Sequence, residues 1–161
     1  MASKQLKQMN ELYASIKERL SNPDMLSVSP WYDMEAKNET LDSNAETDAL
    51  ITRAALETFR EAWIGGTGVA WNDPRVNVLY TDLTGLPPIT IYYGAHEVLV
   101  GEAVEFAKRA KDAGIDVSLH SLPEGQHNFI WGAGPVPEAD RAIEEIANWL
   151  RSKLGLAALA A

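Results

Sequence analysis

The spacing of apolar residues predicts a strand–helix–strand–helix succession in the second half of the chain. Residues 89–93 form a short continuous run rich in β-branched and aromatic side chains, which is typical of a strand buried on both faces, and residues 117–122 predict a second strand. Residues 101–114 and 137–154 carry apolar side chains at three- and four-residue spacing, which predicts amphipathic helices. This order of elements predicts a parallel sheet with a right-handed crossover.

The first half of the chain predicts two more amphipathic helices. Residues 3–20 have apolar side chains on one face, and residues 48–64 repeat the pattern with Thr47 or Asp48 as the N-cap. Proline, glycine and polar residues interrupt the pattern elsewhere. The segments expected to be irregular are 21–24, 31–47 and 71–88, with a short apolar piece at 26–28.

Composition narrows the classes of partner and compartment. The 161 residues fit one domain, and the net charge of −9 with a pI of about 4.8 disfavours nucleic acid and anionic membrane as partners. The chain has no cysteine, which excludes disulfides and thiolate ligands. It has no apolar run long enough to span a membrane, and its N-terminus lacks the apolar core of a secretion signal. We therefore expect a cytoplasmic protein.

Two polar side chains follow the two predicted strands. Glu97 comes shortly after residues 89–93, and His127 comes shortly after residues 117–122. Because ligand chemistry collects at the carboxyl ends of parallel strands, we expect both at the same edge of the sheet. Histidine is the commonest general acid/base side chain, and a carboxylate can hold its ring in one tautomer. The pair therefore predicts the acid and the base of a hydrolytic triad.

Simpler explanations stand beside this one. Glu97 alone is explained as well by a carboxylate that complements a helix N-terminus, and His127 by a surface loop. His96 is expected at the rim and His120 at a half-exposed strand position. The three histidines are too scattered for a metal site, and the glycine-rich stretch 65–68 lacks the lysine and the preceding strand of a phosphate loop. We expect no metal and no cofactor.

The nucleophile of a triad is missing from the pattern. None of the nine serines lies in a Gly-x-Ser-x-Gly elbow, and no His-Gly-Gly oxyanion loop is present. The chain thus offers a base and a residue that orients it, without a nucleophile or an oxyanion hole.

Four stretches, in their order and spacing, connect the chain to a known family. They are Ser-Pro-Trp-Tyr-Asp at 29–33, the segment 73–88 with Asp-Pro at its start and Leu-Pro-Pro at its end, Gly-Ala-His-Glu-Val-Leu at 94–99, and Pro-Glu-Gly-Gln-His-Asn-Phe at 123–129. From about Leu26 to Leu156 the chain resembles the C-terminal part of α/β-hydrolases of the hormone-sensitive-lipase-like (bacterial family IV) esterase branch.

The resemblance implies a partial α/β-hydrolase fold. Residues 26–161 would supply the C-terminal strands of a parallel sheet with flanking helices, and residues 1–25 an N-terminal cap-type helix. It implies hydrolysis of a small-molecule carboxylic ester by a serine mechanism, with the acid at Glu97 and the base at His127. The family usually has aspartate at the acid position, so Glu97 is a departure. The family's oxyanion loop and nucleophile elbow would fall between Met25 and Leu26 and are absent there.

Two hypotheses about function follow. In the first, the chain belongs to the carboxylic ester hydrolases by lineage and is inactive alone, because the nucleophile and the oxyanion hole contribute most of the catalysis. In the second, it is a truncated remnant or a non-enzymatic interaction module. A parallel sheet without its central strands leaves a free edge and uncovered helix faces, so a homo-oligomer or a complex with a complementary fragment is expected.

Overall fold

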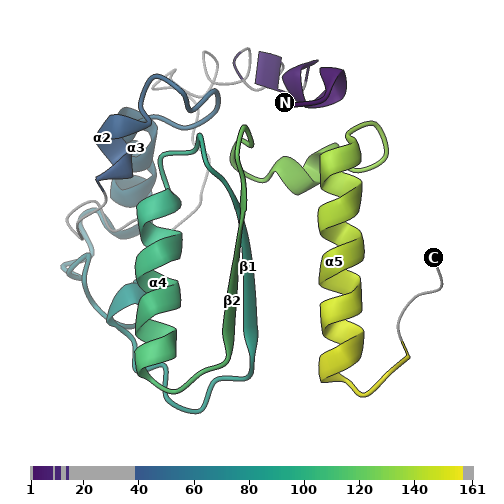
Figure 1. The fold of residues 1–161 in the computed structure, drawn as a ribbon. Helices are drawn as coiled ribbons and strands as arrows, with labels where there is room; N and C mark the ends of the chain where they lie inside the picture. The colour runs from purple at the N-terminus through teal and green to yellow at the C-terminus, as the bar shows by residue number, and fades with distance from the viewer. Residues whose placement is uncertain (1, 9, 12–13, 15–38, 158–161) are drawn as a thin grey trace.

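The computed structural model describes residues 2–8, 10–11, 14 and 39–157 (Figure 1). Residues 4–8 and 10–11 are helical, in agreement with the predicted N-terminal helix. The other elements are α2 (Thr40–Ser43), α3 (Arg53–Ile64), the 3₁₀ helix η1 (Val78–Tyr80), β1 (Ile89–Gly94), α4 (Val100–Asp112), β2 (Val117–Leu122), the 3₁₀ helix η2 (Phe129–Gly132) and α5 (Pro137–Lys153). Within these ranges, no helix combines the length and the apolarity needed to cross a bilayer.

The two strands form a parallel pair, as predicted. Ile89 lies opposite Val117 and Gly94 opposite Leu122, with α4 as the connection between the strands. The pair stands between α4 and α5, so a helix faces each side of the sheet (Figure 1). This arrangement confirms the expected α/β class and agrees with a partial α/β-hydrolase sheet.

Local sequence signals explain the ends of α5. Pro137 occupies the first turn, where its missing N–H is not needed. Glu138 and Asp140 lie in the first turn, and Arg151 and Lys153 lie in the last, so the charges at both ends complement the helix dipole.

The predicted start of the second helix was wrong. α3 begins at Arg53, and the N-cap is Thr52, whose hydroxyl accepts a hydrogen bond from the Ala55 amide at 3.1 Å. Asp48 is instead buried in the turn before the helix, where its carboxylate accepts from the backbone. The segment expected to be irregular before it also contains the short helix α2. The predicted pieces at 21–24 and 26–28 lie outside the described residues.

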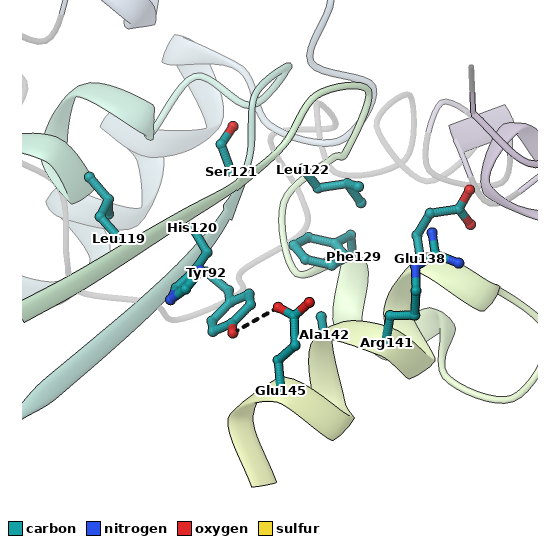
Figure 2. A pocket seen from close by; sticks show the side chains of 10 residues that line it. All are labelled: Tyr92, Leu119, His120, Ser121, Leu122, Phe129, Glu138, Arg141, Ala142 and Glu145. Carbon is teal, nitrogen blue, oxygen red and sulfur yellow. Dashed lines mark hydrogen bonds between the residues drawn. The ribbon is translucent and has the colours of Figure 1, made fainter. Parts of the chain in front are cut away.

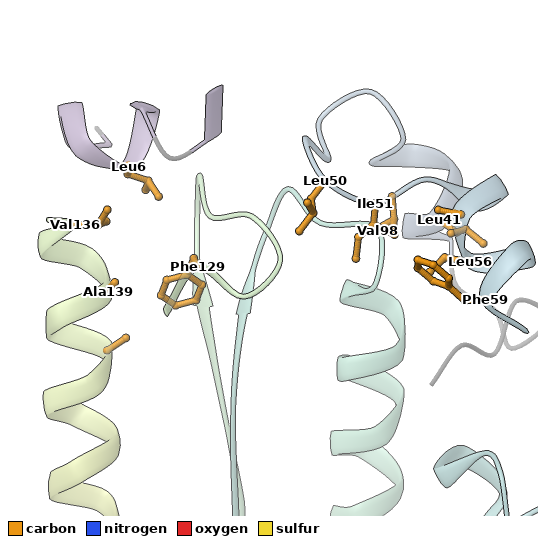
Figure 3. Packing of buried hydrophobic residues seen from close by; sticks show 12 residues of the cluster. Leu6, Leu41, Leu50, Ile51, Leu56, Phe59, Val98, Phe129, Val136 and Ala139 are labelled. Atoms are coloured by element: carbon orange, nitrogen blue, oxygen red, sulfur yellow. The ribbon is translucent and has the colours of Figure 1, made fainter. Parts of the chain in front are cut away.

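Buried apolar side chains gather at the carboxyl end of the sheet, above the two strands in Figure 3. On the α4 side, Val98 lies among residues of α2, α3 and the turn between them. On the α5 side, Phe129 lies near Val136, Ala139 and, from the N-terminal segment, Leu6. The loops that carry Glu97 and His127 are therefore anchored in the core by the residues that follow them.

The apolar stripe expected to bury α5 consists of Ile143, Ile146, Ala147, Leu150 and Leu154, and it is only partly covered: Ile146 and Ala147 are half-buried, and the other three are exposed. Ile143, Leu150 and Leu154 have 39%, 47% and 68% of their surface exposed, whereas the small residues Ala139 and Ala142 are buried. The stripe has the correct helical period, but the described part of the chain provides no element that covers all of it.

A pocket of about 370 Å³ lies between the sheet and α5 (Figure 2). In it, the Tyr92 hydroxyl donates to Glu145 Oε2 at 3.1 Å, and the Tyr92 ring stacks on His120 with centroids 4.3 Å apart. Burial, together with the Glu145 carboxylate, raises the pKa of Tyr92 to about 12. His120 is half-buried here, and this packing accounts for it without a catalytic role.

The backbones that leave β1 and β2 touch at two glycines. A Cβ atom on Gly94 would lie 2.3 Å from the carbonyl carbon of Gly125 and 2.4 Å from its oxygen. The Ala95 amide donates to Leu122 O at 2.9 Å, and the His96 amide donates to Gly125 O at 3.1 Å. Because no side chain separates the two loops, the residues that follow each glycine are brought next to each other.

We expect Gly94→Ala to lower the free energy of unfolding by about 3 kcal/mol, because the new methyl group would overlap backbone atoms that cannot rotate away. The control is Gly114→Ala, which has open space around it but a φ of +82°, and should cost about 1 kcal/mol from backbone strain alone. Urea unfolding of both variants measures the difference. An equal or smaller loss for Gly94→Ala would contradict the close crossing.

Candidate active site

The structure brings Glu97 and His127 together. Glu97 Oε2 lies 2.5 Å from His127 Nδ1, although the residues are 30 positions apart in the sequence. The Glu97 side chain is 7% exposed and the His127 side chain 29% exposed. A buried carboxylate thus meets a partly exposed imidazole at the carboxyl edge of the sheet, where ligand chemistry is expected in open parallel sheets.

A tight turn at the end of β1 fixes the Glu97 carboxylate. Its second oxygen, Oε1, accepts from the Gly94 amide at 3.1 Å, and the Glu97 amide donates to Gly94 O at 3.2 Å. Val98 follows and is fully buried. One carboxylate oxygen is therefore bound to the turn, and the other is directed at the histidine.

The His127 ring is presented by an unusual backbone step. Asn128 adopts the left-handed conformation, with φ 54° and ψ 35°, which asparagine tolerates better than most residues. Phe129 after it is 3% exposed, and Gln126 before it is 2% exposed. His127 is thus flanked in the chain by buried residues, which restrict the backbone that carries its ring.

The contact determines which ring nitrogen carries the proton. A carboxylate only accepts hydrogen bonds, so Nδ1 is the donor toward Glu97. In the neutral ring Nε2 is then unprotonated and can accept a proton. Glu97 is suited to hold the ring in this tautomer, and His127 is suited to general base chemistry.

The other candidate histidines do not join the pair. His96 is half-buried, and its backbone bonds Gly125 O and the Thr47 hydroxyl. His120 lies in the pocket against α5. Across the ranges that the structure covers, no cluster of three or more histidine, aspartate or glutamate side chains is arranged to hold a metal ion.

Sequence reasoning missed three polar residues next to the pair. Asp48 and Gln126 are 1% and 2% exposed, and the Asn44 amide binds the loop of Glu97. Asn44 and Asp48 stand in or beside a stretch so rich in polar residues that it predicts solvent-exposed loop. Their partners in the loop of Glu97 lie at least 50 positions away, so no local pattern could have revealed these contacts.

The family model and the related proteins that match this chain point to the same family. A model of the alpha/beta hydrolase fold matches residues 8–131. The chain is 33% identical to an acetyl-hydrolase of Streptomyces hygroscopicus over 131 residues, covering 80% of this chain and 42% of the relative. It is 30% identical to an esterase of Acinetobacter venetianus over 150 residues, covering 93% of this chain and 46% of the relative. The chain therefore spans less than half the length of these curated relatives.

Solved structures agree with the sequence matches. An esterase from the bacterial hormone-sensitive lipase family superposes with a TM-score of 0.72 at 30% identity, covering 91% of this chain and 50% of that structure. A hormone-sensitive lipase from a metagenome library superposes with a TM-score of 0.66 at 31% identity, over 71% of this chain and 38% of that structure. The chain therefore belongs to the α/β-hydrolase fold family, in the lineage of the hormone-sensitive-lipase-like ester hydrolases.

Proposed function

We propose that this chain supplies the acid and the base of a serine-type ester hydrolase site. Glu97 orients the ring, and His127 acts as general base and then as general acid. The observation that supports this most strongly is the 2.5 Å contact between Glu97 Oε2 and His127 Nδ1. The substrate class is a small-molecule carboxylic ester, in keeping with the lineage, and no metal or cofactor is required.

The proposed chemistry follows from the tautomer. Nε2 of His127 takes the proton from an attacking hydroxyl, and the ring becomes positively charged. The Glu97 carboxylate stabilises that charge at Nδ1. The same proton then passes from Nε2 to the oxygen of the departing alcohol, which restores the neutral ring.

Glutamate at the acid position fits this role. Its side chain is one methylene longer than the aspartate that the family usually has there, and triads with either acid occur. The turn that binds Oε1 to the Gly94 amide supports the view that the extra length is accommodated, because Oε2 still reaches His127.

We propose further that the chain alone does not turn over esters. None of its serines stands in a nucleophile elbow, and no oxyanion loop is present in the sequence. Oxyanion stabilisation and the nucleophile account for most of the rate enhancement in this mechanism, so an acid–base pair alone gives little.

A chimera tests the proposed roles directly. We expect the Acinetobacter venetianus esterase to retain hydrolysis of p-nitrophenyl butyrate when residues 89–134 of this chain replace its matched segment. In that chimera, His127→Ala should lower kcat at least about 10³-fold, because the base is lost. Ser118→Ala is the matched control and should leave kcat unchanged. The unmodified 161-residue chain should show no turnover above its own His127→Ala variant.

Circular dichroism of each chimera separates loss of folding from loss of chemistry. A folded, active chimera whose rate does not depend on His127 would contradict the proposed base. Turnover by the unmodified chain that His127→Ala abolishes would contradict its proposed inactivity.

A second candidate function rests on the uncovered surface. Within the described ranges β1 pairs with β2 alone, which leaves its other edge without a neighbouring strand. Ile143 and Leu150 of α5 are exposed as well. We propose an interaction module whose partner is the remainder of an α/β-hydrolase sheet, because the chain spans only 42% and 46% of its two relatives.

Light scattering after size exclusion measures this association. We expect the chain to bind the unmatched portion of the Acinetobacter venetianus esterase, and Ile143→Asp to weaken binding at least about tenfold by placing a charge in the apolar contact. Val104→Asp on α4, where the side chain is 44% exposed, is the matched control and should have no effect. A stable homodimer that does not bind this partner, or a sharp monomer with a cooperative melt and no binding, would contradict the module.

A further inference from the structure

The chain segment 44–49 binds the backbone carbonyl groups of the loop that carries Glu97. The Asn44 side-chain amide donates to Ala95 O and to Glu97 O, both at 2.9 Å. The Thr47 hydroxyl donates to His96 O at 3.2 Å. Three consecutive carbonyl groups of the Glu97 loop are therefore bound by one short segment about 50 positions earlier in the sequence.

Asp48 extends this contact to the residue that follows Glu97. Its Oδ2 accepts from the Val98 amide at 2.8 Å, and its Oδ1 accepts from the amides of Leu50 and Ile51, both at 2.7 Å. The side chain is 1% exposed, and a buried carboxylate is tolerated only when hydrogen-bond donors surround it. Three backbone amides donate to Asp48. Two belong to the turn before α3 and one to the Glu97 loop, so the carboxylate holds the turn and the loop together.

Gln126 makes the equivalent connection for the histidine loop. Its Nε2 donates to Thr47 O at 2.9 Å, and its Oε1 accepts from the Ala49 amide at 2.7 Å. Gln126 is 2% exposed and directly precedes His127. The three consecutive residues 47–49 therefore bind both loops. Asp48 binds the Glu97 loop, and Thr47 and Ala49 bind Gln126 of the His127 loop.

From this arrangement we propose that Asp48 and Gln126 are positioning residues for the Glu97–His127 pair, an inference that rests on the proposed function. The pair itself has one hydrogen bond, and the imidazole is partly open to water, which competes for that bond. Asp48 binds the amide of Val98, which directly follows Glu97, and Gln126 directly precedes His127 and is bound to the two neighbours of Asp48. These hydrogen bonds restrict relative movement of the two loops, and a displacement of about 1 Å is enough to disrupt such a catalytic contact.

The test uses the proton on His127 Nδ1, observed by nuclear magnetic resonance in the full chain and assigned by its absence in His127→Gln. In Asp48→Asn, an amide group replaces one acceptor oxygen. In Gln126→Glu, the acceptor for Ala49 is retained, but the group facing Thr47 O can no longer donate. We expect exchange of the Nδ1 proton with water to accelerate at least about tenfold in both variants.

Leu79→Ala is the matched control for general destabilisation. Leu79 is 5% exposed in η1, which packs against α4 and lies outside the buried cluster at the carboxyl end of the sheet. We expect this variant to melt at a lower temperature without faster exchange of the Nδ1 proton. A folded chain gives a dispersed spectrum. If Asp48→Asn does not show one, the exchange rate in Gln126→Glu alone tests the positioning roles.

Glu97→Gln separates the two proposals. If this variant removes the Nδ1 signal while Asp48→Asn and Gln126→Glu exchange no faster than Leu79→Ala, the positioning roles are overturned and the pair stands. If Glu97→Gln leaves the signal and its exchange unchanged, the pair itself is overturned, and the positioning roles with it.

Discussion

The structure depends on the direct backbone contact between Gly94 and Gly125. Gly94 is the last residue of β1, Gly125 lies shortly after the end of β2, and any side chain on Gly94 would overlap the carbonyl group of Gly125. The contact draws together two loops that diverge from neighbouring strands, so that Glu97, three residues beyond one glycine, meets His127, two residues beyond the other. The absence of side chains at the crossing thus allows Glu97 and His127, the proposed acid and base, to approach each other.

Buried polar groups stabilise the close approach of the two loops that the glycines allow. The segment before α3 binds the Glu97 loop through a carboxylate and an amide side chain, and it binds Gln126 of the His127 loop through its backbone. The apolar residues Val98 and Phe129 anchor the two loops in the core. This end of the sheet is therefore well packed. In contrast, one edge of β1 has no neighbouring strand among the described residues, and apolar side chains of α5 are exposed. Such surfaces are normally buried inside a protein. The chain spans less than half the length of its two curated relatives.

The elements that depend on local periodicity could be predicted from the sequence. The β1–α4–β2–α5 order, the parallel pairing and the shared edge of Glu97 and His127 follow from hydrophobic spacing and from the rules for parallel sheets. The cap of α3 was misplaced because Asp48 has the residue type of a cap but is used in a long-range contact. The spacing of apolar residues in α5 predicted the helix and its apolar face, but much of that face is exposed. Periodicity shows which face of a helix is apolar and not whether another element covers it. The proposed boundary between residues 1–25 and 26–161 lies outside the described residues.

We propose that Glu97 holds His127 with the proton on Nδ1 and with Nε2 available to accept one. The most direct test is the pair of ring ¹⁵N chemical shifts of His127 in the unmodified chain, at a pH where the ring is neutral. We expect the shifts of the Nδ1–H tautomer, with an unprotonated Nε2. Shifts of the Nε2–H tautomer, or the averaged values of a ring that exchanges freely between tautomers, would contradict it.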